Sequence, residues 1–526
     1  MRLGGLGTLA AMALAAAAGA ACLYVAPSLR GPVPVSQPSI EARQPGVAAD
    51  EPRTVALSMV GGGSFAPVAP VAAGVRGDSL GRPQPPAPEA SRPALAALPN
   101  EQEGAAKAAT DPDDDDDGDV TPTLEGKSSR PPGKRSFTIL HIGDSHTSAD
   151  FLTGELRRRL QARYGRGAPG YITAGHPHIG VRTSSLKITA SAGWTYKSLQ
   201  RPDAVSAEFW LSGYNAVATA AGETMTFASE RPATFDTIEI EVLRQPGGGA
   251  IEVRLDGVVE TSYELKAAKL EPVVIRLQPA RAATEKVREI SITTKGQGTV
   301  SLASVAIYNR QSGLTYNSVG YVGAQVSLIN KFNSKLFAND LIRINPHIVV
   351  LAFGTNEAFK ESLDVAEYAK SYERVVTKIK SILPRAAIVV ISPPDHAELP
   401  AQCRKDKGGQ GSCGREAKSA NAANGTANGA AGGSDCIWRT PAKLNQIREV
   451  QRDIAKRHDL AYWNWASIMP RECGPHQWYT ASPPLMAKDH VHFTIEGYKK
   501  SAEQFLNTLI PVIEKVRVGA YAVPNN

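Results

Sequence analysis

The stretch Phe137-Thr-Ile-Leu-His-Ile142 is a short apolar run, and Gly143-Asp-Ser-His146 follows it directly. An apolar run that ends at a turn signal is typical of a buried strand, and the amphipathic pattern at about residues 148–164 predicts a helix after it. We expect similar strands at residues 347–353, 386–392 and 460–465, and helices at 365–382, 441–458 and 495–516. Short apolar strands that alternate with helices predict an α/β fold, a parallel sheet with helices on both faces.

Residues 180–310 have a different pattern. They contain runs of alternating apolar and polar residues, separated by turns such as Gln245-Pro-Gly-Gly-Gly249, without a strong helical pattern between them. We expect strands at residues 237–242, 250–255, 272–277, 289–294 and 299–308. The pattern predicts an all-β sandwich that is inserted between the first helix and the second strand of the α/β domain, which therefore consists of residues 135–179 and 311–520.

The N-terminal part indicates export. Arg2 is followed by an Ala- and Leu-rich run to about Pro27, so residues 1–30 are expected to be a signal peptide or a membrane anchor. Residues 31–134 are rich in Pro, Ala, Gly and Asp, which predicts a disordered tether. Residues 402–435 are expected to be a low-complexity loop within the α/β domain. We therefore expect a periplasmic or cell-envelope protein that contacts a membrane only through its N-terminal segment.

Composition narrows the function classes. The chain has 526 residues, of which 42% are hydrophobic and 21% charged, which excludes a wholly disordered chain and a multi-span membrane protein. Its net charge of +7 favours an anionic partner such as a cell wall, anionic lipid or nucleic acid. We do not expect nucleic acid, because the sequence contains neither a Cys/His finger nor an RNP-type strand.

The cysteines predict disulfides rather than a metal site. No C-x-x-C spacing occurs, so zinc is not expected. Four of the five cysteines lie close together, and in an exported protein they would form two disulfides with three alternative pairings. The simplest pairing joins Cys403 to Cys413 and Cys436 to Cys473.

Three polar segments follow strand ends of the predicted sheet, where ligands of parallel sheets bind. Ser145 is a candidate nucleophile at a helix start, Asn356 a candidate oxyanion donor, and Asp489 with His492 a candidate acid–base pair. Each candidate also has a simpler interpretation. Ser145 could be a helix cap, Asn356 a turn residue, and His492 a polar residue of a loop. A metal site at His490 and His492 is a weaker alternative. The order of the three polar segments along one sheet favours a serine hydrolase without a metal or cofactor.

These segments resemble blocks I, III and V of the SGNH (GDSL) hydrolases, which contain Gly-Asp-Ser, Gly-x-Asn and Asp-x-x-His. Residues 319–324 are similar to block II, with Gly323 as the candidate oxyanion glycine, although the Asn and Ser of that block are not clearly reproduced. The resemblance implies a flavodoxin-like parallel sheet and makes Ser145 the nucleophile and first oxyanion donor. Gly323 N–H and Asn356 would be the other donors, His492 the base, and Asp489 the residue that orients it.

The sequence around His146, a position where the family usually has Leu, together with the β insert, is similar to the bacterial peptidoglycan O-acetylesterases, in which a carbohydrate-binding-like β-sandwich is inserted at the same place. The resemblance implies a serine esterase that removes O-acetyl groups from peptidoglycan or another cell-envelope polysaccharide through an acetyl-enzyme. The alternatives are a polysaccharide O-acetyltransferase that uses the same site, and a non-catalytic glycan-binding envelope protein.

Overall fold

The computed structural model describes residues 123–125, 137–309, 313–400, 403, 412–413 and 436–519. The predicted signal or anchor segment, nearly all of the predicted tether and most of the predicted loop at 402–435 lie outside these ranges. Among the residues that are described, no helix combines the length and the apolar character that a membrane span requires.

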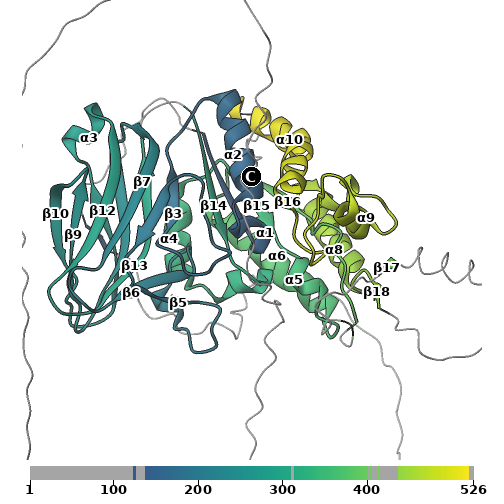
Figure 1. Ribbon diagram of the computed structural model, residues 1–526, viewed down its shortest axis with the longest axis horizontal. Coiled ribbons are helices and arrows are strands. Elements are labelled where there is room, and N and C mark those ends of the chain that lie inside the picture. Colours follow the sequence, from purple (N-terminus) through teal and green to yellow (C-terminus); the bar gives the residue numbers. More distant parts are fainter. Residues whose placement is uncertain are drawn as a thin grey trace, which may run out of the picture. The chain divides into compact units, whose positions relative to one another are not determined.

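A five-stranded parallel sheet forms the centre of the α/β part (Figure 1). Its order is β14-β2-β15-β16-β19, which in chain order is 2-1-3-4-5, the flavodoxin-like arrangement that was predicted. The strands are β2 (Phe137–Gly143), β14 (Leu314–Gly320), β15 (Ile348–Ala352), β16 (Ala387–Ile391) and β19 (Ala461–Trp463).

Helices cover both faces of this sheet, as expected. One face packs against α4 (Ser334–Ile344), α6 (Val365–Ile382) and α8 (Leu444–Arg457), and the other against α2 (Phe151–Tyr164) and α10 (Ile495–Arg517). The first helix was predicted to begin at about residue 148, but α2 begins at Phe151, and a separate short helix, α1 (Ser145–Ser148), precedes it. Other short helices are α3 (Ala280–Thr284), α5 (Thr355–Ala358), α9 (Gly474–Thr480), η1 (Ser206–Glu208), η2 (Val326–Lys331) and η4 (Trp465–Ile468).

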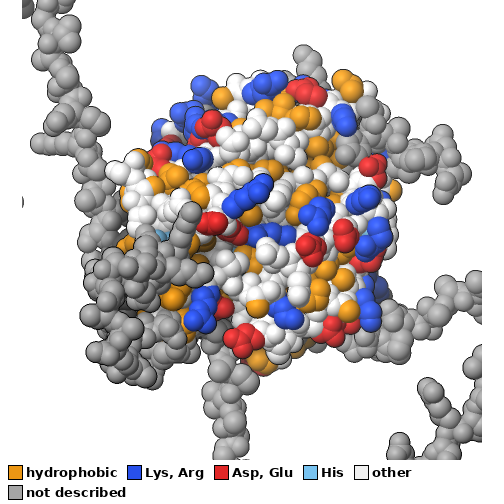
Figure 2. Space-filling model, turned by 90° about the vertical axis from the view of Figure 1, so that its right-hand side faces the viewer, with side chains coloured by type: hydrophobic (Ala, Val, Ile, Leu, Met, Phe, Trp, Pro, Cys, Tyr) orange, Lys and Arg blue, Asp and Glu red, His pale blue; other side chains and the backbone are white. Residues whose placement is uncertain are grey.

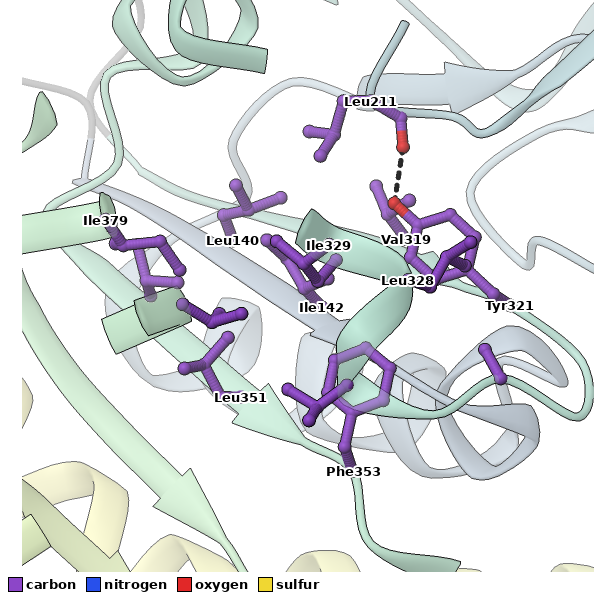
Figure 3. Packing of buried hydrophobic residues seen from close by; sticks show 14 of the residues in the cluster. Leu140, Ile142, Leu211, Val319, Tyr321, Leu328, Ile329, Leu351, Phe353 and Ile379 are labelled. Atoms are coloured by element: carbon purple, nitrogen blue, oxygen red, sulfur yellow. Dashed lines mark hydrogen bonds between the residues drawn. The ribbon is translucent and has the colours of Figure 1, made fainter. Parts of the chain in front are cut away.

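Figure 3 shows the core on the α6 side of the sheet. Side chains at alternate positions of β2 and at matching positions of β14 and β15 point into it, where they meet η2 and α6, as in Leu140, Ile142, Val319, Leu351, Leu328 and Ile379. Tyr321 donates a hydrogen bond to the Leu211 carbonyl at 2.5 Å, which joins this core to the region between α2 and β14.

Two antiparallel sheets occupy the region between α2 and β14, as the alternating pattern predicted. The first has the order β11-β8-β13-β6-β5, with β3 also on β13 and β1 parallel to β11; the second has the order β10-β9-β12-β7-β4. Their inward side chains share one buried core. The strands are β1 (Thr123–Glu125), β3 (Gly170–Thr173), β4 (Lys187–Ala190), β5 (Thr195–Ser198), β6 (Tyr214–Ala218), β7 (Thr224–Ala233), β8 (Thr237–Arg244), β9 (Ala250–Leu255), β10 (Val258–Glu264), β11 (Glu271–Leu277), β12 (Val287–Lys295) and β13 (Val300–Tyr308).

Two of these strands lie outside the predicted limits of the insert. β3 precedes the predicted boundary at residue 180, and β1 lies within the predicted tether. β3 pairs with β13 from Ser304 to Ile307, so the antiparallel region begins directly after α2.

A buried ion cluster joins the antiparallel sheets to α4. The guanidinium of Arg343 bonds to Glu239 at 2.9 Å and to Asp340 at 2.5 Å, and it also bonds to Glu241. Burial raises the pKa of Glu241 to about 8. Since a buried guanidinium needs partners, the bonds of Arg343 to Glu239 and Asp340 tie β8 of the first antiparallel sheet to α4.

The predicted disulfide pairing is wrong. Cys403 is bonded to Cys436 and Cys413 to Cys473, so the two bridges interleave. The reason is the parallel pairing of β17 (Ser412–Cys413) with β18 (Ile437–Trp438), which places Cys413 opposite Trp438 and leaves Cys436 to meet Cys403. Nearness in sequence does not decide the pairing when a strand pair intervenes.

The surface mixes charges of both signs. On the face shown in Figure 2, Lys and Arg side chains are interspersed with Asp and Glu side chains among small hydrophobic areas. A charge of one sign therefore does not dominate this face.

Candidate active site

The predicted nucleophile lies where β2 ends. Gly143 has no space for a side chain, because a Cβ there would lie 2.6 Å from the Ala352 carbonyl oxygen. Asp144 then caps α1 by accepting the His146 N–H at 3.0 Å. Ser145 is the first residue of α1 and is half-buried. The strand, the tight turn and the cap therefore place the Ser145 hydroxyl at a helix start beside the carboxyl end of the sheet.

The structure brings Ser145 together with the predicted acid–base pair. Ser145 Oγ lies 2.9 Å from His492 Nε2, and His492 Nδ1 lies 2.7 Å from Asp489 Oδ2. The other carboxylate oxygen of Asp489 accepts the N–H groups of Val491 at 3.0 Å and His492 at 2.9 Å. Both oxygens of Asp489 are thus held, and the imidazole is oriented with Nε2 toward Ser145.

The charges of this pair support each other. Burial alone would lower the pKa of His492, but its hydrogen bond to Asp489 and the nearby negative charge raise that pKa above its usual value. For Asp489, burial alone would raise the pKa. The hydrogen bond from His492 and its positive charge outweigh this effect and lower the pKa of Asp489 to about 2. Asp489 therefore stays ionised across the working pH range, and the imidazole can accept a proton there.

The two remaining predicted residues lie at neighbouring strand ends. Gly323 follows β14, is exposed, and has a positive φ of 73°. Asn356 lies in α5, directly after β15, and its Nδ2 donates to the carbonyl of the adjacent Ala324 at 2.9 Å. An amide has two N–H donors, so the second one of Asn356 remains for a ligand. β2, which leads to Ser145, lies between β14 and β15.

His146, which departs from the family pattern, is a core residue. It is 1% exposed, and its Nδ1 lies 2.9 Å from the hydroxyl of Tyr498. Its ring centroid is 5.2 Å from that of His492. Burial lowers its pKa well below the usual value, so His146 stays neutral and packs beneath the His492 ring.

The sequence reasoning missed a stack of rings behind the acid–base pair. The His490 ring stacks on Trp438 with centroids 3.7 Å apart, and its Nε2 lies 3.2 Å from His476 Nδ1. His490 has a left-handed backbone with a φ of 54°, which is strained for a bulky residue. The only signal in the sequence was that Trp438 and His476 each follow a cysteine closely.

His490 and His492 face different partners. His490 faces His476 and the Lys488 carbonyl, whereas His492 faces Ser145 and Asp489. Within the described ranges, no group of three or more His, Cys, Asp or Glu side chains could hold a metal ion.

Part of the chain is similar in sequence or fold to known proteins. Residues 291–500 match the model of the GDSL-like lipase/acylhydrolase family. No curated protein sequence matches the chain. A solved structure of a peptidoglycan O-acetylesterase has a TM-score of 0.55 and 24% identity, and the match covers 72% of this chain and 92% of that chain.

A family two carbohydrate esterase from Clostridium thermocellum, solved with cellohexaose, has a TM-score of 0.25 and 9% identity, over 64% of this chain and all of that one (100%). The family two carbohydrate esterase from Cellvibrio japonicus has a TM-score of 0.22 and 13% identity, and the match covers 66% of this chain and 97% of that chain. The matched range contains Gly323, Asn356, Asp489 and His492. Ser145 lies outside that range, and the fold brings its hydroxyl to His492. Residues 291–500 are therefore similar to the GDSL-like lipase/acylhydrolase family, in agreement with the resemblance to the SGNH hydrolases, and the fold of the chain is similar to that of a peptidoglycan O-acetylesterase.

Proposed function

We propose that this chain is a serine esterase that removes O-acetyl groups from a cell-envelope polysaccharide, with peptidoglycan as the first candidate. The observation that carries the proposal is the continuous hydrogen-bonded series from Ser145 Oγ to His492 Nε2 at 2.9 Å and from His492 Nδ1 to Asp489 at 2.7 Å. A serine, a histidine and a carboxylate at these distances form the arrangement that activates a hydroxyl for acyl transfer.

In the first half-reaction, His492 Nε2 takes the Ser145 proton while Oγ attacks the acetyl carbonyl carbon. Asp489 stabilises the imidazolium that forms. The negative charge on the carbonyl oxygen is met by the N–H groups of Ser145 and Gly323 and by the second N–H of Asn356. Each donor of this kind contributes about 3 kcal/mol to transition-state stabilisation.

The tetrahedral intermediate then collapses. The bond from the acetyl carbon to the sugar oxygen breaks, and His492 returns its proton to that oxygen, which leaves an acetyl-enzyme on Ser145. In the second half-reaction, a water molecule gives a proton to His492 and attacks the acetyl carbon. Acetate leaves, and Ser145 Oγ recovers the proton from His492.

Three features support a polysaccharide of the cell envelope as substrate. The similar structure with a TM-score above 0.5 is a peptidoglycan O-acetylesterase. The two disulfides and the N-terminal apolar segment fit a protein outside the cytoplasm, in the periplasm or envelope. The antiparallel region next to the site, proposed as an inserted carbohydrate-binding-like sandwich at about residues 180–310, would extend the surface offered to a glycan.

The test is acetate release from O-acetylated peptidoglycan by the full chain, compared with Ser145→Ala. We expect release by the wild type and loss of at least about a thousandfold in the variant. Turnover of a small acetyl ester that depends on Ser145, without release from peptidoglycan, would keep the esterase and reject this substrate. Acetyl transfer to an added oligosaccharide that is faster than hydrolysis would favour the O-acetyltransferase. Binding of the glycan without either reaction would favour a non-catalytic binding protein.

A further inference from the structure

The turn that presents Gly323 has little packing of its own. Gly323 is exposed, and a Cβ built on it would meet no atom of the described chain within 4 Å beyond its sequence neighbours. Its φ of 73° is one that glycine adopts readily. The direction of the Gly323 N–H therefore depends on the bonds that hold the residues before and after it.

The residues before the turn are held by the parallel sheet and by the antiparallel region. Tyr321 N–H donates to the carbonyl of Gly143, two residues before Ser145, at 2.9 Å. Gln200, which follows β5, donates from Nε2 to the Val322 carbonyl at 2.9 Å. These two bonds fix where the chain enters the turn.

The residues after the turn are held by α5. Asn356 Nδ2 donates to the Ala324 carbonyl at 2.9 Å, and Glu357 Oε1 accepts the Val326 N–H at 2.7 Å. Two adjacent residues of α5 thus bind this segment with opposite polarity, Asn356 as a donor and Glu357 as an acceptor. The exit from the turn is therefore tied to the helix that follows β15.

The bond from Glu357 takes the place of a helix cap. Val326 is the first residue of η2, and within the described part of the chain the Gln325 side chain makes no capping bond to that helix. The first N–H groups of a helix have no partner inside it, and a buried N–H needs an acceptor. Val326 and Glu357 are each 1% exposed, so water does not readily replace this carboxyl oxygen.

Glu357 can serve as an acceptor in either of its charge states. Burial raises the pKa of Glu357 to about 7, and the charge of Asp144 adds to this effect. Both the acid and the carboxylate are therefore present near neutral pH, and each has an oxygen that can accept the Val326 N–H. The contact requires an acceptor oxygen rather than a negative charge.

We propose that Glu357 is a positioning residue for the oxyanion site, and that its bond to Val326, with the bond from Asn356 to Ala324, holds the Gly323 N–H toward the carbonyl oxygen of the substrate. The inference rests on the proposed function and adds a residue that acts through Gly323. A donor stabilises a developing oxyanion only when its position is fixed before the reaction. A displaced donor should therefore slow the chemical step and affect substrate binding little.

The experiment compares kcat and KM of the full chain on 4-nitrophenyl acetate. Glu357→Ala removes the acceptor, so we expect kcat to fall about thirtyfold with KM nearly unchanged. Glu357→Gln keeps an acceptor oxygen and should recover most of kcat, to within about threefold of the wild type.

Thr294→Ala is the matched control for lost stability. Thr294 is 2% exposed, lies in β12, and accepts the Glu223 N–H at 3.0 Å through its hydroxyl. Its loss also leaves a backbone N–H without its acceptor, but in the antiparallel sheets. Both Ala variants should lower the midpoint of thermal unfolding by about a few degrees, and only Glu357→Ala should lower kcat.

A second measurement reads the oxyanion site without acetyl turnover. Paraoxon phosphorylates an activated serine: the bond from Ser145 Oγ to phosphorus forms, 4-nitrophenolate leaves, and His492 takes the serine proton. The phosphoryl oxygen needs the same donors as the acetyl carbonyl. The rate of 4-nitrophenolate release should fall about thirtyfold in Glu357→Ala and largely recover in Glu357→Gln.

The outcomes separate this inference from the proposed function. An unchanged kcat in Glu357→Ala, a loss that appears in KM, or an equal loss in Glu357→Gln or Thr294→Ala would overturn the positioning role and leave the esterase standing. If the wild type turns over no acetyl ester but is phosphorylated at Ser145 with the expected dependence on Glu357, the proposed function fails and the positioning role stands. Absence of both reactions would overturn both.

Discussion

The two halves of the candidate site are built in different ways. The nucleophile turn, residues 143–148, belongs to the core: Asp144, His146 and Thr147 are each 1% exposed. The acid–base loop, residues 487–494, lies at the surface: the side chains of Asp489 and His492 are 44% and 32% exposed. The chemistry thus joins a buried serine turn to a partly exposed loop that lies more than 300 residues further along the chain.

The contacts that hold the two halves also differ. The nucleophile turn is fixed by the sheet, since Asp144 N–H donates to the Ala352 carbonyl at 3.1 Å and Tyr321 N–H to the Gly143 carbonyl at 2.9 Å. The acid–base loop is held through His490, which stacks on Trp438, and through the bond from Ala397 N–H to the His490 carbonyl at 2.9 Å. Damage to the turn should therefore unfold the protein, whereas damage to the loop should inactivate a protein that remains folded.

The largest effect is expected in the acid–base loop. His492→Ala removes the proposed base and should lower kcat by about 10⁵, and Asp489→Asn should lower it by about 10⁴. The steady-state rate on a small acetyl ester measures both effects. Because both side chains are partly exposed, the midpoints of thermal unfolding should stay within a few degrees of the wild type. Comparable loss of fold and of activity would mean that the loop is as integral to the core as the turn.

A pair of glycines tests the nucleophile turn. A Cβ at Gly320 would clash with the backbone of Ser148, so Gly320→Ala should lower the free energy of unfolding by about 3 kcal/mol. Gly323→Ala is the matched control, because a Cβ there meets nothing within 4 Å and only the positive φ opposes it, by about 1 kcal/mol. Urea titration of both variants gives the two values. Equal losses would show that the packing against Ser148 does not determine the stability of the turn.

The ring stack should have a smaller effect, mainly on activity. Trp438→Ala removes the ring on which His490 stacks, so the strained backbone next to Asp489 loses support. We expect kcat/KM to fall about tenfold while the free energy of unfolding changes little, because Trp438 lies outside the buried cores. Trp438→Phe keeps a stacked ring and should retain most of the activity. If Phe and Ala lower the rate equally, stacking is not what positions the loop.

The contrast between turn and loop explains what the sequence could predict. The strand ends, and the meeting of Ser145, His492 and Asp489 beside them, were predictable, because apolar runs mark buried strands and parallel strands end at one edge. β14 was missed, since Asn317 interrupts its apolar pattern. That side chain is buried, accepts the Tyr171 N–H at 2.8 Å and donates to the Ile139 carbonyl at 3.0 Å, and no local pattern reveals such partners.

The supports of the acid–base loop were beyond sequence reasoning for the same reason. The stack of Trp438, His490 and His476 and the interleaved disulfides all join segments that are distant in the chain. Cysteine spacing favoured a pairing of neighbours, whereas the pairing of β17 with β18 decides the connectivity.

The smallest effect concerns pH and comes from the exposed half of the site. The proposed base must be neutral, so kcat/KM should rise with pH through the raised pKa of His492 and then level off. Asp489→Asn removes the carboxylate that raises this pKa, so the inflection of the residual activity should move to lower pH. Asp364→Asn, at the exposed N-cap of α6, should leave the profile unchanged. An inflection that stays in place after Asp489→Asn would contradict the assignment of the titrating group to His492.

Stability should respond to the same ionisation with the opposite sign. Because folding raises the pKa of His492, its contribution to stability is complete below the unfolded pKa and is lost as pH rises through the folded value. The pKa of Asp489 is lowered to about 2, so its contribution is present above the unfolded pKa and is lost as pH falls toward 2. Activity therefore rises over the range in which the ion pair between His492 and Asp489 disappears, and the loop then depends more on the stacking of Trp438 on His490. The loss of activity in Trp438→Ala should consequently be larger at about pH 8.5, above the usual pKa range of histidine, than at about pH 6, within that range. Equal losses at the two pH values would contradict this division of support.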